Sequence, residues 1–147
     1  MHIRTEDSAQ TMRSAPTTPM HWAVRLVVLL GALLTAMGAV IALAQPAMLV
    51  SPHAEISEAV RIYAGYLAAR NLAIGAALLA LFLLGARRAL GQLMVLVGTI
   101  QLLDAAIDVA EGRWIVAPGV LVLGIVFLAT AKAAAGAGLW RLEAWRS

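Results

Sequence analysis

The apolar run that decides the fold occupies residues 22–44 and reads WAVRLVVLLGALLTAMGAVIALA. Arg25 near its start and Thr35 are its main interruptions. A helix of these 23 residues would be roughly 35 Å long, enough to span a hydrocarbon core of about 30 Å. Gln45-Pro46 follows directly, and proline disfavours continuation of a helix. The stretch therefore predicts a membrane-spanning helix.

The same run has an alternative interpretation as a cleaved leader. Ala42-Leu43-Ala44 before Gln45 resembles a signal-peptidase site, and Arg25 provides a positive flank. However, the apolar run is longer than the roughly 7–15 residues of a typical signal core. We therefore expect the helix to be retained in the mature protein.

Three further apolar stretches follow at residues 61–84, 89–110 and 115–135. Short glycine-containing turns at 85–88 and 111–114 separate them, so consecutive spans should be antiparallel neighbours. The chain of 147 residues is 62% hydrophobic and 13% charged, which leaves too few polar residues to cover a water-facing surface. The predicted fold is all-α, a transmembrane four-helix bundle that runs up-down-up-down.

The rest of the chain adds little outside the lipid. Residues 1–20 are rich in Ser, Thr and Pro without periodicity and predict a disordered cytoplasmic tail. The transmembrane domain should cover residues 21–138, and residues 139–147 should form an interfacial tail with Trp140 and Trp145. Between the first two spans, Ser51-Pro52 predicts the start of a short interfacial helix.

Basic residues predict the orientation in a cell (plasma or inner) membrane. With both termini in the cytoplasm, eight basic residues lie inside and two, Arg61 and Arg113, lie outside, which is a strong positive-inside bias. Apart from Arg87-Arg88 the arginines are scattered singly, so the net charge of +3 does not indicate a nucleic-acid partner. The cytoplasmic set is Arg4, Arg13, Arg25, Arg87, Arg88, Lys132, Arg141 and Arg146.

Polar residues inside the spans are the candidate site. Residues three, four and seven apart share a helix face, which groups Tyr63, Tyr66 and Arg70 in the second span. The same rule groups Gln101, Asp104 and Asp108 in the third span. Arg70 and Asp104 are expected at similar depths, where an unpaired charge costs about 2.5–3.5 kcal/mol, so the two should pair, ideally through two hydrogen bonds. Asn71, rotated by about 100°, should face a different neighbour.

Two interpretations of this pair remain open. It is either an ion pair that fixes the register of the helices or part of an outward-opening pocket walled by Tyr63, Tyr66, Gln101 and Asp108. Asp104 and Asp108 have helical ligand spacing, but the nearest histidine, His53, lies in a connection, so no metal is expected. No cofactor is expected either, since no cysteine and no nucleotide-binding motif are present.

The spans also carry pairs of small residues four apart: Ala32/Ala36, Gly65/Ala69 and Ala131/Ala135. Small residues let membrane helices approach closely, so these pairs predict helix contacts. The alternative is that an alanine-rich composition produces the spacing by chance.

Residues 65–75 (GYLAARNLAIG) and 87–91 (RRALG), followed by Asp104, resemble a family of small bacterial and fungal four-helix membrane proteins of unknown function, broadly DoxX-like. The resemblance implies the four-helix architecture and points to Arg70, Asn71 and Asp104 as the positions to test. DoxX proteins are linked to sulfur and quinone redox chemistry, which we do not extend to this cysteine-free chain.

We therefore expect a non-enzymatic accessory, small-molecule-binding or transport-related component of the membrane, with lipid and a small-molecule ligand as partners. A homo-oligomer is compatible with this expectation. The alternative is an enzyme in which Asp104 or Asp108 transfers a proton and Arg70 orients an anionic substrate. A small multidrug exporter is disfavoured because the first span carries no acidic residue.

Overall fold

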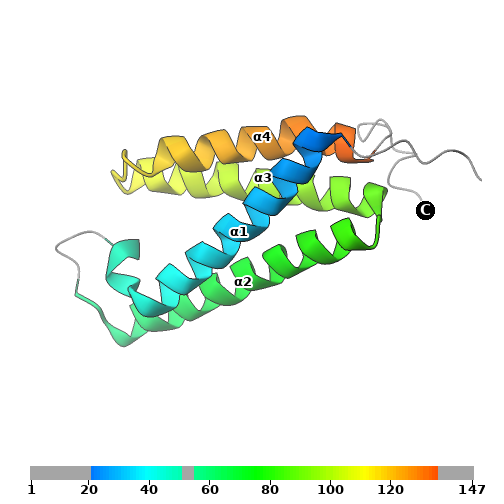
Figure 1. The fold of residues 1–147 in the computed structure, drawn as a ribbon. Coiled ribbons are helices and arrows are strands. Elements are labelled where there is room, and N and C mark those ends of the chain that lie inside the picture. Colours follow the sequence, from blue (N-terminus) through cyan, green and yellow to red (C-terminus); the bar gives the residue numbers. More distant parts are fainter. Residues whose placement is uncertain (1–20, 51–54, 136–147) are drawn as a thin grey trace, which may run out of the picture.

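The computed structural model describes residues 21–50 and 55–135. They form four α-helices and one short 3₁₀ helix, η1 (Figure 1). The helices are α1 (Trp22–Ala44), α2 (Glu58–Leu83), α3 (Arg87–Ala110) and α4 (Ala117–Ala135), and η1 covers Pro46–Leu49. Both expected tails, 1–20 and 139–147, lie outside the described residues.

The helix ends follow local capping chemistry. The first span ends where Gln45-Pro46 predicted, but α2 begins at Glu58 rather than near Arg61, because the Ser57 hydroxyl accepts a hydrogen bond from the backbone N–H of Val60. The expected cap at Ser51-Pro52 lies outside the described residues. The short helix between the first two spans is η1, which begins earlier in the chain.

Both tight turns use glycine in the left-handed region. Gly85 follows α2 with φ +65°, and Gly112 follows α3 with φ +72°. In each turn the N–H of the third residue after the helix donates to a carbonyl five residues earlier, from Ala86 to Leu81 and from Arg113 to Asp108. This closing arrangement satisfies carbonyls at the helix end and reverses the chain within a few residues.

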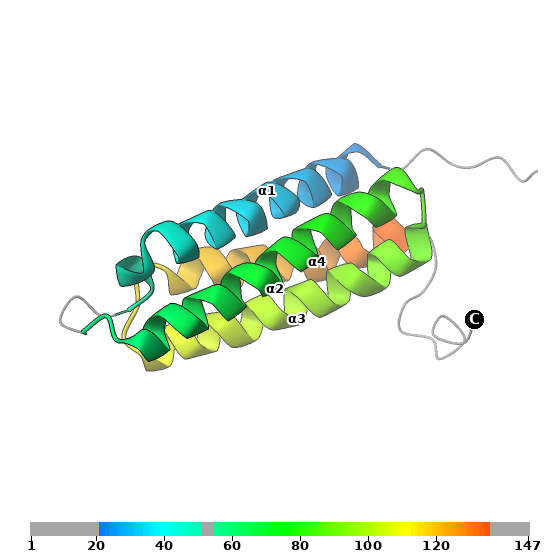
Figure 2. The ribbon, with the colours of Figure 1, turned by 90° about the horizontal axis from the view of Figure 1, so that it is seen from below.

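The helices form two antiparallel hairpins. In the first hairpin α1 packs along α2, and in the second hairpin α3 packs along α4, while contacts between the hairpins are sparser (Figures 1 and 2). One end of the bundle, the η1 end, carries η1 and the α3–α4 turn. The other, the Gly85 end, carries the α2–α3 turn, the start of α1 and the end of α4. The hairpins diverge toward the η1 end in Figure 1.

The core explains why the bundle is closed at one end and not at the other. The larger core cluster extends from the middle of the bundle to the Gly85 end, and Phe127, near the middle of α4, is fully buried against Gly31 of α1, where a Cβ would collide with its ring. Large side chains from three other helices complete this cluster, including Val28, Leu78 and Met94. Toward the η1 end the second cluster is an alanine seam between α1 and α2 alone: Ala39, Ala42, Ala64 and Ala68. No equivalent large side chain joins the hairpins there in either cluster.

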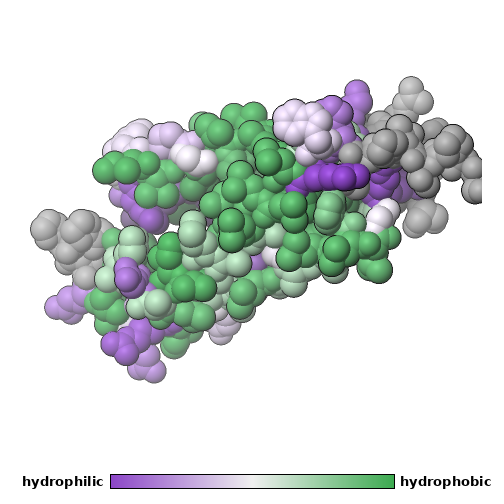
Figure 3. All heavy atoms as spheres, viewed as in Figure 1, coloured by the Kyte–Doolittle hydropathy of each residue, from purple (hydrophilic) through white to green (hydrophobic). Residues whose placement is uncertain are grey.

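All four helices are long and apolar enough to cross a membrane. On the face shown in Figure 3, apolar side chains cover the middle and hydrophilic ones gather toward both ends. Many of the exposed residues are large and apolar, such as Leu33 and Leu103, each about 60% exposed. A water-soluble protein seldom exposes so much contiguous apolar surface. The predicted all-α four-helix bundle of a multi-pass membrane protein is confirmed.

The small-residue pairs have mixed outcomes. Ala131 and Ala135 are buried against Gly91 of α3, and Ala32 lies beside Gly75 of α2. The pair Gly65/Ala69 makes no such contact, since a Cβ on Gly65 would meet nothing within 4 Å and Ala69 is exposed. The prediction for Gly65/Ala69 is wrong because α2 turns Ala64 and Ala68, one position away, toward α1.

Candidate functional site

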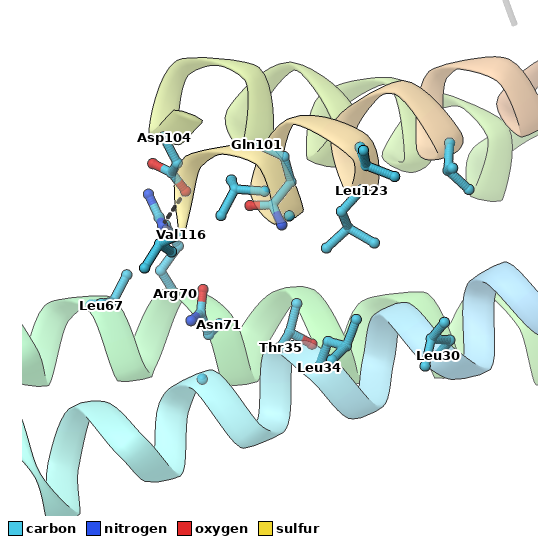
Figure 4. A pocket seen from close by; sticks show the side chains of 15 residues that line it. Leu30, Leu34, Thr35, Leu67, Arg70, Asn71, Gln101, Asp104, Val116 and Leu123 are labelled. Carbon is cyan, nitrogen blue, oxygen red and sulfur yellow. Dashed lines mark hydrogen bonds and ion pairs between the residues drawn. The ribbon is translucent and has the colours of Figure 1, made fainter. Parts of the chain in front are cut away.

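A cavity of about 590 Å³ lies between the two hairpins, in the half of the bundle toward the η1 end. All four helices or their flanking turns contribute to it, and its wall is mainly aliphatic (Figure 4). This volume is in the range of pockets that hold small molecules. The apolar wall consists of Leu30, Leu34, Leu67, Val116, Val120, Val122, Leu123 and Val126, with Gly38 and Gly119.

Arg70 and Asp104 form an ion pair at one end of this cavity. Nη2 of Arg70 donates a hydrogen bond of 3.0 Å to Oδ2 of Asp104, which links α2 to α3 (Figure 4). The side chains are 40% and 31% exposed, so both retain surface toward the cavity or the surroundings. The predicted contact is present, through one hydrogen bond rather than two. Arg70 lies on an exposed face of α2, and its long side chain allows it to reach Asp104 from there.

Three uncharged polar residues also line the cavity. Asn71 projects from α2, Gln101 from α3 and Thr35 from α1 (Figure 4). The Thr35 hydroxyl donates to the carbonyl of Ala32 in its own helix. Within the described residues, the side-chain amides of Asn71 and Gln101 have no protein hydrogen bond, so they are available to a bound molecule.

The neighbour of Asn71 agrees with its angular position on α2. A Cβ placed on Gly38 of α1 would lie 3.1 Å from Nδ2 of Asn71, so this amide faces α1, the partner of α2 in the first hairpin. Arg70, one residue earlier, turns to α3 instead. Adjacent residues of α2 thus present polar groups on two sides of the cavity.

Asp108 lies apart from the cavity and has its own partner. Its carboxylate is 3.0 Å from Nη1 of Arg113, and the residue is 7% exposed. The α3–α4 turn produces this contact, because the bond from the Arg113 N–H to the Asp108 carbonyl holds the arginine over the end of α3. The expectation that Asp108 walls the pocket does not match the structure. The proximity of two oppositely charged residues across a glycine turn was a signal for this pair that the sequence-based reasoning did not use.

Tyr63 and Tyr66 also lie outside the cavity wall. Their residues are 74% and 69% exposed on the surface of α2, although they share a face with Arg70. The difference has a packing cause, because the buried stripe of α2 consists of small residues such as Ala64 and Ala68 that fit close to α1. The exposed tyrosines remain suited to a membrane interface, where an apolar ring with a polar tip is favoured.

A second cavity of about 320 Å³ lies near Arg61, beside Pro46 and the alanine seam. Its wall carries few polar groups besides that guanidinium. Among the described residues, no group of three or more histidine, aspartate or glutamate side chains is arranged to hold a metal ion. His53 lies outside the described residues.

Comparison with known proteins gave a match to one family model. Searches among curated proteins and among solved structures found no match. A family model described as a domain of unknown function (DUF4267) matches residues 31–140, which include the greater part of α1 and the other three helices. The matched segment contains almost the whole cavity wall, with Leu30 just outside it. Since the match covers well over half of the chain, this protein belongs to the DUF4267 family of unknown function.

Proposed function

We propose that this membrane protein binds a small molecule in the cavity between its hairpins and acts as a non-enzymatic binding or transport-related component. The observation that carries the proposal is the cavity itself. It combines a volume of about 590 Å³, a largely aliphatic wall and a few convergent polar groups. This combination is characteristic of ligand sites in proteins. The cavity lies within one bundle, so the proposal requires no second copy of the chain.

The state of the two aspartates favours binding over proton transfer. Asp104 accepts a hydrogen bond from Arg70, and Asp108 contacts Arg113. A carboxylate acting as a base must offer an oxygen to the proton it removes. For Oδ2 of Asp104 and Oδ1 of Asp108 the guanidinium already occupies that position. We propose a DoxX-like arrangement of the four helices, and we propose no redox step.

We further propose that the η1 end faces outward and the Gly85 end faces the cytoplasm of a cell membrane. Arg87, Arg88 and Lys132 lie toward the Gly85 end, while Glu55, Glu58 and Glu111 lie toward the η1 end. An excess of basic residues on the cytoplasmic side supports this orientation. The cavity then lies in the outer half of the membrane.

A pair of topology reporters tests this orientation. We expect alkaline phosphatase, which is active only outside the cytoplasm, to be inactive when fused after Arg88 and active when fused after Gly112. The same two positions carrying a fluorescent protein that matures only in the cytoplasm should give the opposite pattern. Phosphatase activity in the fusion after Arg88 would show that the orientation is opposite to the one proposed.

The binding proposal is tested by filling the cavity. Gly119 lines it, and an added Cβ there meets nothing within 4 Å, so Gly119→Trp should place an indole in the cavity without displacing a helix. Gly65→Trp is the matched control, since Gly65 also has open space but lies outside the cavity wall. Native mass spectrometry of the purified proteins should show a bound small molecule in the wild type and in Gly65→Trp.

We expect the occupancy of that molecule to fall at least about tenfold in Gly119→Trp, since an indole projecting into the cavity would overlap the bound molecule. Circular dichroism should show equal helix content in all three proteins. A molecule bound equally to all of them, or a wild type no more occupied than Gly119→Trp, would contradict the proposal.

A further inference from the structure

The two ends of the cavity differ in chemistry. Arg70, Asp104, Asn71 and Gln101 gather toward one end, while Leu30 of α1 marks the other (Figure 4). Val126 of α4 also lines the cavity, ten residues along the chain from Val116. Val126 is the central residue of α4, so the aliphatic end lies near the middle of the membrane span. The polar end lies closer to the η1 end, since Asp104 is six residues, about 9 Å, from the end of α3.

The length of the cavity exceeds that of a polar head group. Val116 and Val126 both line it, and ten residues of helix correspond to about 15 Å. A molecule that fills it therefore has a polar head at the Arg70–Asp104 pair and an apolar chain directed toward the middle of the membrane. A lipid of the leaflet at the η1 end has this direction.

The cavity also has an opening toward lipid. Leu30, Val122 and Val126 line it and are nevertheless 46%, 59% and 36% exposed. These three residues belong to α1 and α4, two helices from different hairpins that contact each other sparsely. On the η1 side of the contact between Phe127 and Gly31, a hydrocarbon chain can enter between these helices without crossing water.

The polar end has no net charge. The guanidinium of Arg70 and the carboxylate of Asp104 neutralise each other at 3.0 Å. A charged head group would either meet the like charge of one member of the pair or displace that member and leave the other without its partner, which is costly inside a membrane. The amides of Asn71 and Gln101, which have no protein hydrogen bond within the described residues, offer both donors and acceptors.

We infer that the cavity binds a single-chain lipid whose head group is uncharged and carries both hydroxyl and carbonyl groups. This inference rests on the proposed function and specifies its ligand class. The head bonds to the amides and to the remaining donors and acceptors of the ion pair, and the chain lies along the aliphatic wall. Laterally entering lipid is the source of the ligand.

The test uses lipids that share a twelve-carbon chain and differ in the head. The protein is placed in phosphatidylcholine nanodiscs with a photoreactive diazirine derivative of monolauroylglycerol, and labelled peptides are identified by mass spectrometry. Unlabelled monolauroylglycerol, laurate, dodecylamine and dodecane are the competitors. They present an uncharged, an anionic, a cationic and no polar head, respectively.

We expect the labels to lie on the cavity wall of α1 or α4. Monolauroylglycerol should reduce labelling at a mole fraction about tenfold lower than that required of any other competitor, as expected for two hydrogen bonds. Gln101→Leu should weaken monolauroylglycerol competition about fivefold and leave dodecane competition unchanged. Thr99→Leu is the matched control on α3, since Thr99 donates within its own helix and lies outside the cavity wall.

The outcomes separate this inference from the proposed function. One outcome is that laurate, dodecylamine or dodecane competes more strongly than monolauroylglycerol while Gly119→Trp abolishes labelling and Gly65→Trp retains it. That result would overturn the inference of an uncharged head group and leave the proposed binding cavity intact. Equal labelling of both tryptophan variants would overturn both. Loss of selectivity in Gln101→Leu alone, with Thr99→Leu unchanged, supports the inference.

Discussion

Replacing Arg70 by leucine is expected to lower the free energy of unfolding by about 2 kcal/mol, and Asp104→Leu should have a similar effect. Each single change leaves the other charge within the membrane span without its partner, which costs about 2.5–3.5 kcal/mol on insertion scales. Partial exposure of both side chains reduces that cost. Reversible unfolding in mixed detergent micelles measures it.

The double variant separates the two interpretations of the pair. Arg70→Leu/Asp104→Leu removes both charges, so its stability should return to within about 1 kcal/mol of the wild type. If the pair also binds the ligand, the double variant should be stable but should lose the bound molecule. A stable double variant with unchanged occupancy would make the pair a device for helix register alone.

Arg61→Leu is the matched control for this series. Arg61 belongs to the same helix but is exposed near its start, and it forms no ion pair among the described residues. Its replacement should change the free energy of unfolding by less than about 0.5 kcal/mol. A loss as large as that of Arg70→Leu would mean that charge removal itself, rather than a lost partner, destabilises the protein.

The second large effect is expected at Gly91, where α3 lies in close contact with α4. A Cβ there would lie 2.7 Å from the Cβ of Ala135 and 2.9 Å from the carbonyl oxygen of Ala131. Backbone atoms cannot rotate away as a side chain can, so Gly91→Ala forces the helices apart. We expect a loss of about 2 kcal/mol, because overpacking outweighs the gain in helix propensity of about 1 kcal/mol.

Gly65→Ala is the control, and its expected change in the free energy of unfolding has the opposite sign. Gly65 lies within a helix and has open space, so alanine there adds helix propensity without a collision and should stabilise the protein by up to about 1 kcal/mol. The same unfolding measurement serves both variants. Equal stability changes of Gly91→Ala and Gly65→Ala would contradict the close approach of α3 and α4.

The sequence by itself determined the four spans and their turns. The reason is solvation: an apolar run of membrane-spanning length is stable as a helix in lipid, because each backbone group bonds within the segment. Gln45-Pro46 and the glycines at 85 and 112 then marked the ends of the helices. The contact between Arg70 and Asp104 was also predictable, since two opposite charges at one depth in lipid have few alternative partners.

Only the tertiary structure decided which faces meet and where space remains. In an alanine-rich bundle, several faces of a helix are smooth enough to pack, so α2 turned Ala64 and Ala68 to its neighbour and left Tyr63 and Tyr66 outside. The cavity arises because Phe127 joins the hairpins near the middle of the bundle, while no large side chain in either core cluster does so toward the η1 end. That difference depends on side chains from separate helices, whose relative rotation is set by close packing rather than by the local sequence.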